Sequence, residues 1–458
     1  MTSFLEHSIA EIFNRFLRHP RKEASSGLRL GRIVADGQVT NQWLTLAAEA
    51  ALRHVFILGN SGYGKTSLIK EASRQAIEKG WGRVDIIQHS DLQPFLLGSI
   101  AAWERQTQTD LSERTVIIAP PDRVWATGMN LLEAQDEHEL FVLAAELAEM
   151  IRVRFGLESI GVRILELLRN TVFVLASTHY TLAEFRLFLH SPAFRTALLQ
   201  QVTNAEIRSY FSEHYDRLSA AEQGIYAAAL LNKISDLSAD PLVADVLGQR
   251  QSAVSLTNAL DRQMWLLFNV DKAVLREQSA TLAGLFFIRL KNAIFARRRR
   301  GIVMVTLDEA QNIVRTDSGL DTALAETRKY GASLFCSCQQ LHQITPPVRA
   351  ALLGVGTQIF FRTSGPDSAE VAKYLDGGKH LAERLRNLPQ RHAIVKTGDE
   401  YIREIEIPIL AEPAIQTRNV YERCMRRWAR PRTEVEAEIR QRHEQFTRTA
   451  NNALDNWE

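Results

Sequence analysis

The sequence has few of the features that mark secreted or membrane proteins. Only three cysteines, Cys336, Cys338 and Cys424, occur in 458 residues. A small and odd number of cysteines in a long chain argues against a disulfide framework and fits a reducing compartment. No uncharged apolar run approaches the roughly 20 residues that cross a bilayer, and the first 22 residues carry charges throughout. We therefore expect a cytoplasmic protein without an integral membrane segment.

A large excess of charge of either sign is also missing. The formal net charge is +2, with 24% charged and 45% hydrophobic residues, which is ordinary for a globular protein. The chain as a whole is therefore not one that coats nucleic acid, and such contacts must come from local clusters. Two basic clusters occur, ARRRRG at 296–301 and RCMRRWARPR at 423–432. A solvated helix end explains the first more simply, whereas DNA, a partner surface and self-association all stay open for the second.

The clearest motif is GNSGYGKT at 59–66, which matches the phosphate-loop pattern G-x-x-x-x-G-K-[ST] in full. An apolar run precedes it and an amphipathic helical pattern follows. Glycines let the backbone N–H groups face an anion, and the helix N-terminus adds partial positive charge. We expect Lys65 to reach the β- and γ-phosphates and the Thr66 hydroxyl to bind Mg²⁺. The predicted cofactors are ATP and Mg²⁺, and the predicted nucleotide-binding residues are Gly59, Asn60, Ser61, Gly62, Tyr63, Gly64, Lys65, Thr66 and Ser67.

Hydrolysis also needs an acid that binds the metal ion and a group that activates water. The segment GIVMVTLDEAQNIV at 301–314 offers both. Its apolar residues predict a buried strand, from whose end Asp308 and Glu309 emerge. Asp308 would complete the magnesium shell, and Glu309 would polarise the attacking water. Two solvated acids at a strand end are common, but the phosphate loop upstream favours the catalytic interpretation.

The next apolar run, ASLFCSCQQ at 332–340, ends in glutamines. Gln339, the first polar residue after the run, is the better candidate to reach the γ-phosphate or the attacking water. An amide that merely caps the strand is the alternative. Cys336 and Cys338 have no evident metal-binding partners, so we interpret them as packing residues.

The organisation of the chain follows from its apolar periodicity. Short β-branched runs at 55–58, 84–91, 114–122, 264–271, 302–309, 332–340 and 357–364 predict buried strands. Between 133 and 262 the periodicity is helical. Strands that alternate with helices predict an α/β fold with a mainly parallel sheet, into which an all-α domain is inserted. The predicted parts are 1–54 (helix and short strands), 55–132 (core, first part), 133–262 (helical insertion), 263–412 (core, second part, ending in a hairpin that turns near Gly398–Asp399) and 413–458 (helical tail).

The order of the motifs resembles the HerA/FtsK superfamily of P-loop ATPases. The closest likeness is to HerA-like proteins and to the coupling proteins of conjugative type IV secretion (TraG/TraD-like). The likeness covers about residues 28–380 and is carried by LDEAQ, AETRKYG, CQQLHQ and FFRTS in this order, with NLLE at 130–133 as a weaker match. It implies a RecA-like core, a hexameric ring, active sites between subunits and DNA in a central pore.

The same resemblance implies a role for an arginine. Arg328, in ETRKYG, matches the arginine that reaches into the neighbouring subunit's site, where a guanidinium neutralises charge on the transferring phosphoryl group. A surface arginine beside Lys329 is the alternative. Arg362 is a second candidate for the role in trans.

Two departures from the family affect the expected partners. Coupling proteins carry N-terminal transmembrane helices and HerA carries an N-terminal β-barrel domain, whereas residues 1–54 predict neither. The leading hypothesis is an ATP-driven, helicase-like DNA translocase that acts as a ring oligomer on double-stranded DNA. The alternatives are a secretion-system ATPase that moves proteins, and an ATP-dependent scaffold that regulates a partner effector such as a nuclease.

Overall fold

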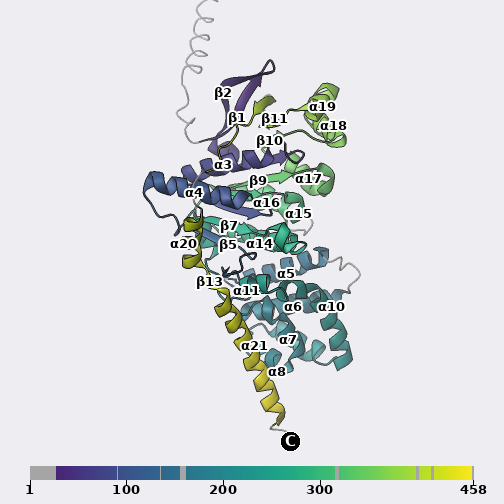
Figure 1. Cartoon of the computed structure of the whole chain (residues 1–458). Coiled ribbons are helices and arrows are strands. Elements are labelled where there is room, and N and C mark those ends of the chain that lie inside the picture. Colours follow the sequence, from purple (N-terminus) through teal and green to yellow (C-terminus); the bar gives the residue numbers. More distant parts are fainter. Residues whose placement is uncertain are drawn as a thin grey trace, which may run out of the picture.

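A single large sheet organises the molecule (Figure 1). The computed structural model describes residues 27–89, 91–134, 136–154, 161–314, 319–398, 402–413 and 417–455, so the predicted N-terminal helix lies outside the described residues. Eleven strands of this part of the chain follow the order β2-β1-β12-β11-β10-β3-β9-β8-β4-β7-β5. Their bounds are Leu28–Ala35 (β1), Gln38–Leu46 (β2), Val55–Leu58 (β3), Gly82–Ile87 (β4), Thr115–Ile118 (β5), Trp265–Asn269 (β7), Val303–Leu307 (β8), Ala332–Cys338 (β9), Thr357–Phe360 (β10), His392–Thr397 (β11) and Arg403–Glu406 (β12).

The sheet has a parallel part and an antiparallel part. All neighbours from β10 through β3, β9, β8, β4 and β7 to β5 run parallel. The strands β11, β12, β1 and β2 continue the sheet in antiparallel pairs. Each of the seven apolar runs expected to form a buried strand overlaps one of the parallel strands, so the predicted mainly parallel α/β sheet is confirmed. The arms of the predicted hairpin pair as β11 and β12, although residues 399–401 at its turn lie outside the described residues.

The parallel strands are buried on both faces, as expected for this sheet type. In β3, Phe56 and Leu58 contribute to one hydrophobic core, whereas Val55 and Ile57 contribute to the other. The second core is completed by three helices, α3 (Lys65–Glu78), α4 (Leu92–Thr107) and α20 (Arg418–Trp428). The first core is completed by α14 (Gln278–Phe295), α15 (Ala310–Val314), α16 (Leu320–Glu326), α17 (Pro346–Leu353), α18 (Gly365–Tyr374) and α19 (Gly378–Asn387).

The described elements between residues 137 and 261 are all helical. They are α5 (Glu137–Arg154), α6 (Val162–Ser177), the 3₁₀ helix η3 (Leu182–Glu184), α7 (Phe185–His190), α8 (Pro192–Leu199), α9 (Ala205–Ser209), the π-helix η4 (Tyr210–Tyr215), α10 (Ala220–Ser238), α11 (Pro241–Leu247) and α12 (Leu256–Asp261). This block lies at the end of the molecule opposite β1 and β2 (Figure 1). Its apolar side chains belong to the same core as Phe56, and its helices α5 and α12 pack against α14.

The C-terminal segment contacts both the α/β core and the helical block. After α20, the short strand β13 (Arg430–Pro431) pairs with β6 (Trp125–Ala126), and α21 (Arg432–Asp455) runs along the helical block against α8 and α11 (Figure 1). Arg442 of α21 donates to the buried carboxylate of Glu184 at 2.7 and 3.0 Å. The smaller described elements are α2 (Ala48–Ala51), α13 (Lys272–Leu275), the 3₁₀ helices η5 (Thr327–Tyr330) and η6 (Leu341–Gln343).

No helix among the described residues is both long enough and apolar enough to cross a membrane.

Candidate functional site

The phosphate loop connects the end of β3 to the start of α3 at the carboxyl edge of the parallel strands. Its backbone is fastened to both neighbouring strands. The N–H of Gly59 donates to the carbonyl of Cys338 at 3.3 Å on the β9 side, and the N–H of Asn60 donates to the carbonyl of Arg362 at 2.8 Å on the β10 side. The loop therefore lies at the carboxyl edge of the strands, where open α/β sheets bind their ligands.

Two of its glycines cannot be replaced without a clash. A Cβ at Gly64, which has φ +115°, would lie 3.0 Å from the Phe361 ring and 3.2 Å from the Arg391 Cα. A Cβ at Gly59 would lie 2.6 Å from the Phe361 Cβ. Glycine is thus required by the close approach of the segments after β10 and before β11, in addition to its freedom to adopt positive φ.

Lys65 is the first residue of α3 and is 7% exposed. Its Nζ donates to the carbonyls of Gly59 at 2.6 Å and Asn60 at 3.1 Å, so its charged end lies against the loop. Burial lowers the pKa of Lys65, and the charges of Glu309 and Asp308 oppose that shift. The lysine and the two predicted acids therefore share one electrostatic environment.

The two acids follow β8 and are held by the neighbouring strand. Ser337 of β9 donates its hydroxyl to Asp308 Oδ1 at 2.5 Å, and its Oγ accepts from the Glu309 N–H at 3.3 Å. Burial raises the pKa of Asp308, the hydrogen bond from Ser337 lowers it, and the charge of Glu309 raises it again. A cation beside Asp308 would therefore stabilise its ionised form, which fits the oxygen ligands that Mg²⁺ prefers.

Glu309 is oriented by several side chains. Gln339 donates its Nε2 to Glu309 Oε1 at 2.8 Å, and Gln311 donates to Oε2. His89, which follows β4, has its Nε2 4.0 Å from Oε1. Glu309 itself has φ +58°, a left-handed conformation that is uncommon outside glycine and recurs at functional sites.

The structure thus brings Lys65, Asp308, Glu309 and Gln339 to one edge of the sheet. Sequence reasoning missed Ser337, Gln311 and His89, which hold the acids in place. A signal for Gln311 was available, because it lies two residues after Glu309 in the LDEAQ motif. His89 follows an expected strand, and parallel strands end at the same edge.

Arg328 lies elsewhere. It belongs to η5, just before β9 begins, and so sits at the amino edge of the sheet, opposite the phosphate loop. There it lines a cleft of about 600 Å³ together with Arg53 and Lys396. The structure does not bring Arg328 to the site of its own chain. Arg362, the second candidate for the role in trans, instead lies beside its own phosphate loop, where its guanidinium contacts Tyr63.

The basic cluster at 423–432 is largely engaged within the chain, whereas in the cluster at 296–301 Arg297 is buried and Arg298, Arg299 and Arg300 are exposed. Arg297 is 4% exposed and donates to the carbonyls of Tyr330, Leu260 and Gly301. In the second cluster, Arg423 pairs with Glu104 at 2.5 Å, Arg427 with Glu113, Arg430 with Glu438 and Arg432 with Asp245. Trp428 donates its indole N–H to the carbonyl of Ser112 at 2.8 Å. These contacts favour structural roles for most of the arginines and for Trp428.

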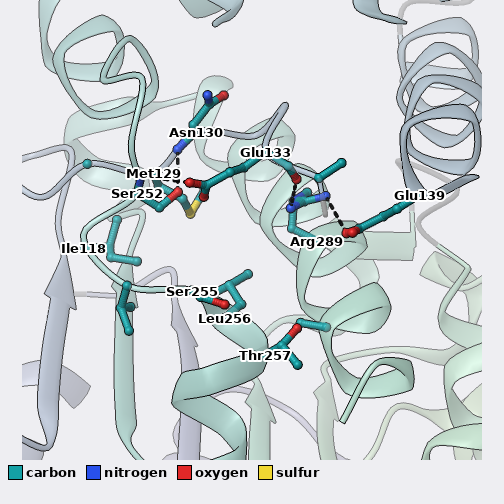
Figure 2. A pocket seen from close by; sticks show the side chains of 14 residues that line it. Ile118, Met129, Asn130, Glu133, Glu139, Ser252, Ser255, Leu256, Thr257 and Arg289 are labelled. Atoms are coloured by element: carbon teal, nitrogen blue, oxygen red, sulfur yellow. Dashed lines mark hydrogen bonds and ion pairs between the residues drawn. The ribbon is translucent and has the colours of Figure 1, made fainter. Parts of the chain in front are cut away.

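Asn130 and Glu133 of the NLLE stretch line a second cavity, of about 270 Å³, together with Ile118, the last residue of β5 (Figure 2). The Asn130 amide donates to the carbonyls of Tyr180 at 3.3 Å and Arg250 at 3.0 Å. Arg289 of α14 donates to the carbonyl of Glu133 and lies 3.7 Å from a carboxylate oxygen of Glu139 (Figure 2). The stretch therefore joins the core to the helical block.

Comparison with known proteins supports the fold. No family model matches the chain, and no curated protein matches it either. The bacterial conjugative coupling protein TrwB, in its unbound monoclinic form, has a TM-score of 0.57 at 16% identity, over 87% of this chain and 92% of that one. TrwB in complex with ADP and Mg²⁺ has a TM-score of 0.56 at 16% identity, over 85% and 96%. VirB4 of Thermoanaerobacter pseudethanolicus has a TM-score of 0.57 at 14% identity, over 85% and 98%.

At such low identity, the TM-scores and the coverage of both chains establish a shared fold. The predicted RecA-like P-loop core with a mainly parallel sheet is therefore confirmed, and the structural matches agree with the likeness to conjugative coupling proteins seen in the sequence.

Proposed function

We propose that the protein is an ATP-driven, helicase-like DNA translocase that works as a hexameric ring in the cytoplasm and hydrolyses ATP at its subunit interfaces. The convergence of Lys65, Asp308, Glu309 and Gln339 at one edge of the sheet carries this proposal. A chain that only bound nucleotide would not need a buried acid pair held by Ser337 and Gln339.

Each residue has a defined task in this proposal. Lys65 neutralises the β- and γ-phosphates, while the loop from Gly59 to Ser67 holds them with its backbone N–H groups. Asp308 and Thr66 supply oxygen ligands for Mg²⁺, which spreads the charge of the transferring phosphoryl group when bound. Glu309 accepts the proton of the attacking water, and the Gln339 amide orients Glu309 and that water.

The site is completed by a neighbouring subunit. Because Arg328 lies at the amino edge of the sheet, it acts only on a site that faces that edge from another copy. In a closed ring with one repeated interface, the amino edge of one subunit can face the carboxyl edge of the next. The guanidinium of Arg328 then stabilises the transition state in trans. Arg53 and Lys396, in the same cleft, add positive charge there.

DNA is the proposed cargo because the structural match to a conjugative coupling protein spans 87% of the chain and 92% of that protein. VirB4 matches with the same TM-score, which favours a second candidate, an ATPase that moves proteins through a secretion system. A scaffold that regulates a partner nuclease is the third candidate, and the catalytic geometry around Glu309 argues against it.

ATP turnover with and without DNA tests the proposal. Linear double-stranded DNA should raise the turnover of the purified ring several-fold, and single-stranded DNA of equal length should raise it less. Lys65→Ala, assayed in parallel, measures any contaminating ATPase. Basal turnover that DNA leaves unchanged would contradict the translocase and favour the protein-moving alternative.

A further inference from the structure

The phosphate loop has two flanks with different chemistry. Towards β9 and β8 lie Gln339 and Glu309, which must face the γ-phosphate and the water if the site hydrolyses ATP. The opposite flank is formed by the segments after β10 and before β11. A nucleotide whose γ-phosphate points to the first flank extends its α-phosphate, ribose and base towards the second. The residues of that second flank therefore have access to the nucleoside end.

Arg362 is the cation of the second flank. Its carbonyl accepts from the N–H of Asn60 at 2.8 Å, which anchors its backbone to the loop. Its guanidinium carbon lies 5.3 Å from the centre of the Tyr63 ring, and its Nη1 donates to the Tyr63 hydroxyl at 3.0 Å. Within the described part of the chain, no carboxylate forms an ion pair with Arg362.

Its neighbour Arg391 shows the contrast. Arg391 pairs with the Glu406 carboxylate at 2.8 Å and donates to the carbonyl of Ile407 at 3.1 Å. Its charge is therefore balanced within the fold. Arg362 differs from Arg391 because its partner, Tyr63, is neutral. The charge of Arg362 is therefore available to an anionic ligand.

Tyr63 is itself held in place. Its carbonyl accepts from the N–H of Arg391 at 3.0 Å, and the carbonyl of the preceding Gly62 accepts from Gln390 Nε2 at 2.9 Å. These bonds fix the tip of the loop, so the Tyr63 ring presents one face to the guanidinium. Cation–π contact and the hydroxyl acceptor together restrict where that guanidinium lies.

We propose that Arg362 binds the nucleoside end of ATP, at its α-phosphate and ribose, in the same subunit that supplies the phosphate loop, with Tyr63 as its positioning residue. This inference rests on the proposed nucleotide site, and it replaces the trans role that the sequence suggested for Arg362. ADP and ATP both carry the nucleoside end, so Arg362 contributes equally to the binding of each.

Calorimetric titration with Mg·ADP and with a non-hydrolysable ATP analogue tests the inference. Arg362→Ala should weaken both ligands by about tenfold, because a charge-assisted hydrogen bond is lost. Arg362→Lys, which keeps the charge without the planar fork, should recover part of the affinity. Arg386→Ala, an exposed arginine on nearby α19, is the matched control and should bind both ligands as the parent does. Melting curves confirm that each variant is folded.

Tyr63 variants test the positioning role. Tyr63→Phe keeps the ring but loses the acceptor and should weaken Mg·ADP by about threefold. Tyr63→Leu removes both contacts and should approach the loss seen for Arg362→Ala. The double variant Tyr63→Leu/Arg362→Ala should be no weaker than Arg362→Ala alone, because Tyr63 acts through Arg362. Additive losses would overturn the positioning role.

Mixed rings separate the cis role from a trans role. Arg362→Ala subunits mixed with Lys65→Ala subunits should show no more ATP turnover than the Arg362→Ala subunits in the mixture supply, since both changes act on the same subunit's site. Recovery in that mixture, or parent-like Mg·ADP affinity of Arg362→Ala, would overturn the inference while leaving the nucleotide site intact. Failure of the proposed function looks different, because DNA would then leave the ATP turnover of the parent unchanged, whatever the affinity of Arg362→Ala for Mg·ADP.

Discussion

At the residue scale, the proposed role of Glu309 as general base depends on how its side chain is held. Its left-handed backbone turns the side chain away from the strand direction immediately after β8 ends. Gln339 and Gln311 then occupy both carboxylate oxygens, and His89 lies near one of them. A general base must be held near the proton that it accepts, and this network supplies that restraint.

Replacement of this acid should separate binding from hydrolysis. Glu309→Gln keeps the size of the side chain, but its amide cannot accept a proton at neutral pH and can accept only one of the hydrogen bonds that Gln339 and Gln311 donate. We expect parent-like affinity for Mg·ATP and a turnover lower by about a thousandfold. Glu383→Gln, an exposed residue of α19, is the control and should leave both values unchanged. Turnover retained by Glu309→Gln would remove Glu309 as the base.

The burial of His54, just before β3, leads to a prediction about how the free energy of unfolding depends on pH. It is 3% exposed and accepts from the N–H of Leu334 through Nδ1 at 3.1 Å. Burial lowers its pKa from 6.5 to about 4. Between these values the unfolded chain binds a proton that the folded chain does not, so the free energy of unfolding decreases as the pH falls. The decrease in the free energy of unfolding reaches about 3 kcal/mol once the pH has fallen to the folded-state pKa. It is absent above pH 6.5, the pKa of the unfolded chain.

Urea unfolding at pH 7, 6 and 5 measures this effect. His54→Asn cannot titrate, and asparagine tolerates the left-handed backbone at this position, where φ is +68°. The stability difference between parent and variant should therefore shift in favour of the variant as the pH falls. A difference that stays constant from pH 7 to pH 5 would exclude His54 as the titrating group.

At the element scale, α21 connects segments that are distant in the sequence. It packs against α8 and α11, and its Arg442 reaches Glu184 of η3 and the carbonyl of Gly248, which lies just after α11. Glu184 is 1% exposed and also accepts from the hydroxyl of Thr181 at 2.7 Å. The final helix therefore stabilises the helical block by neutralising a buried carboxylate.

Loss of this contact should destabilise the whole chain. Arg442→Ala leaves the Glu184 charge buried without its main partner and should lower the free energy of unfolding by roughly 3 kcal/mol. Arg440→Ala, an exposed arginine of the same helix, should change it little. The double variant Arg442→Ala/Glu184→Gln should recover part of the loss, because the uncompensated charge is gone. Equal effects of Arg442→Ala and Arg440→Ala in urea unfolding would contradict the stabilising role of Arg442.

At the scale of the whole molecule, the proposed catalytic groups lie on opposite edges of one sheet. Lys65 and Glu309 are at the carboxyl edge, and Arg328 is at the amino edge. No movement within a chain brings these edges together without breaking the parallel ladder between β3 and β9. A site that includes Arg328 therefore requires a second copy, which is the reason for proposing a ring.

Mixed rings test this arrangement. Arg328→Ala and Lys65→Ala subunits should each be inactive alone, and an equal mixture should regain part of the parent turnover, since some interfaces then combine an intact loop with an intact Arg328. Native mass measurement shows whether the rings are intact. Intact mixed rings without any recovery would count against the trans role of Arg328.

Much of the site could be predicted from the sequence because its main residues are local to recognisable patterns. The phosphate loop is one continuous segment, and Asp308 and Glu309 directly follow an apolar run. The hydrogen bond from Ser337 to Asp308 could not be predicted, because it depends on β8 and β9 being neighbours in register. Strand order is not encoded in any single segment.

The sequence by itself determined the seven buried parallel strands, the helices of the block inserted between them and the nucleotide motif. Short-range periodicity and glycine spacing are properties of neighbouring residues, so these features can be predicted from single segments. Tertiary structure alone decided that Arg362 meets Tyr63, 299 positions away, and that most of the arginines in the basic cluster at 423–432 are paired with acids elsewhere in the chain. Charge pairing between distant segments depends on how the sheet folds them together. That is why clusters of arginine in the sequence do not by themselves locate a basic surface on the folded protein.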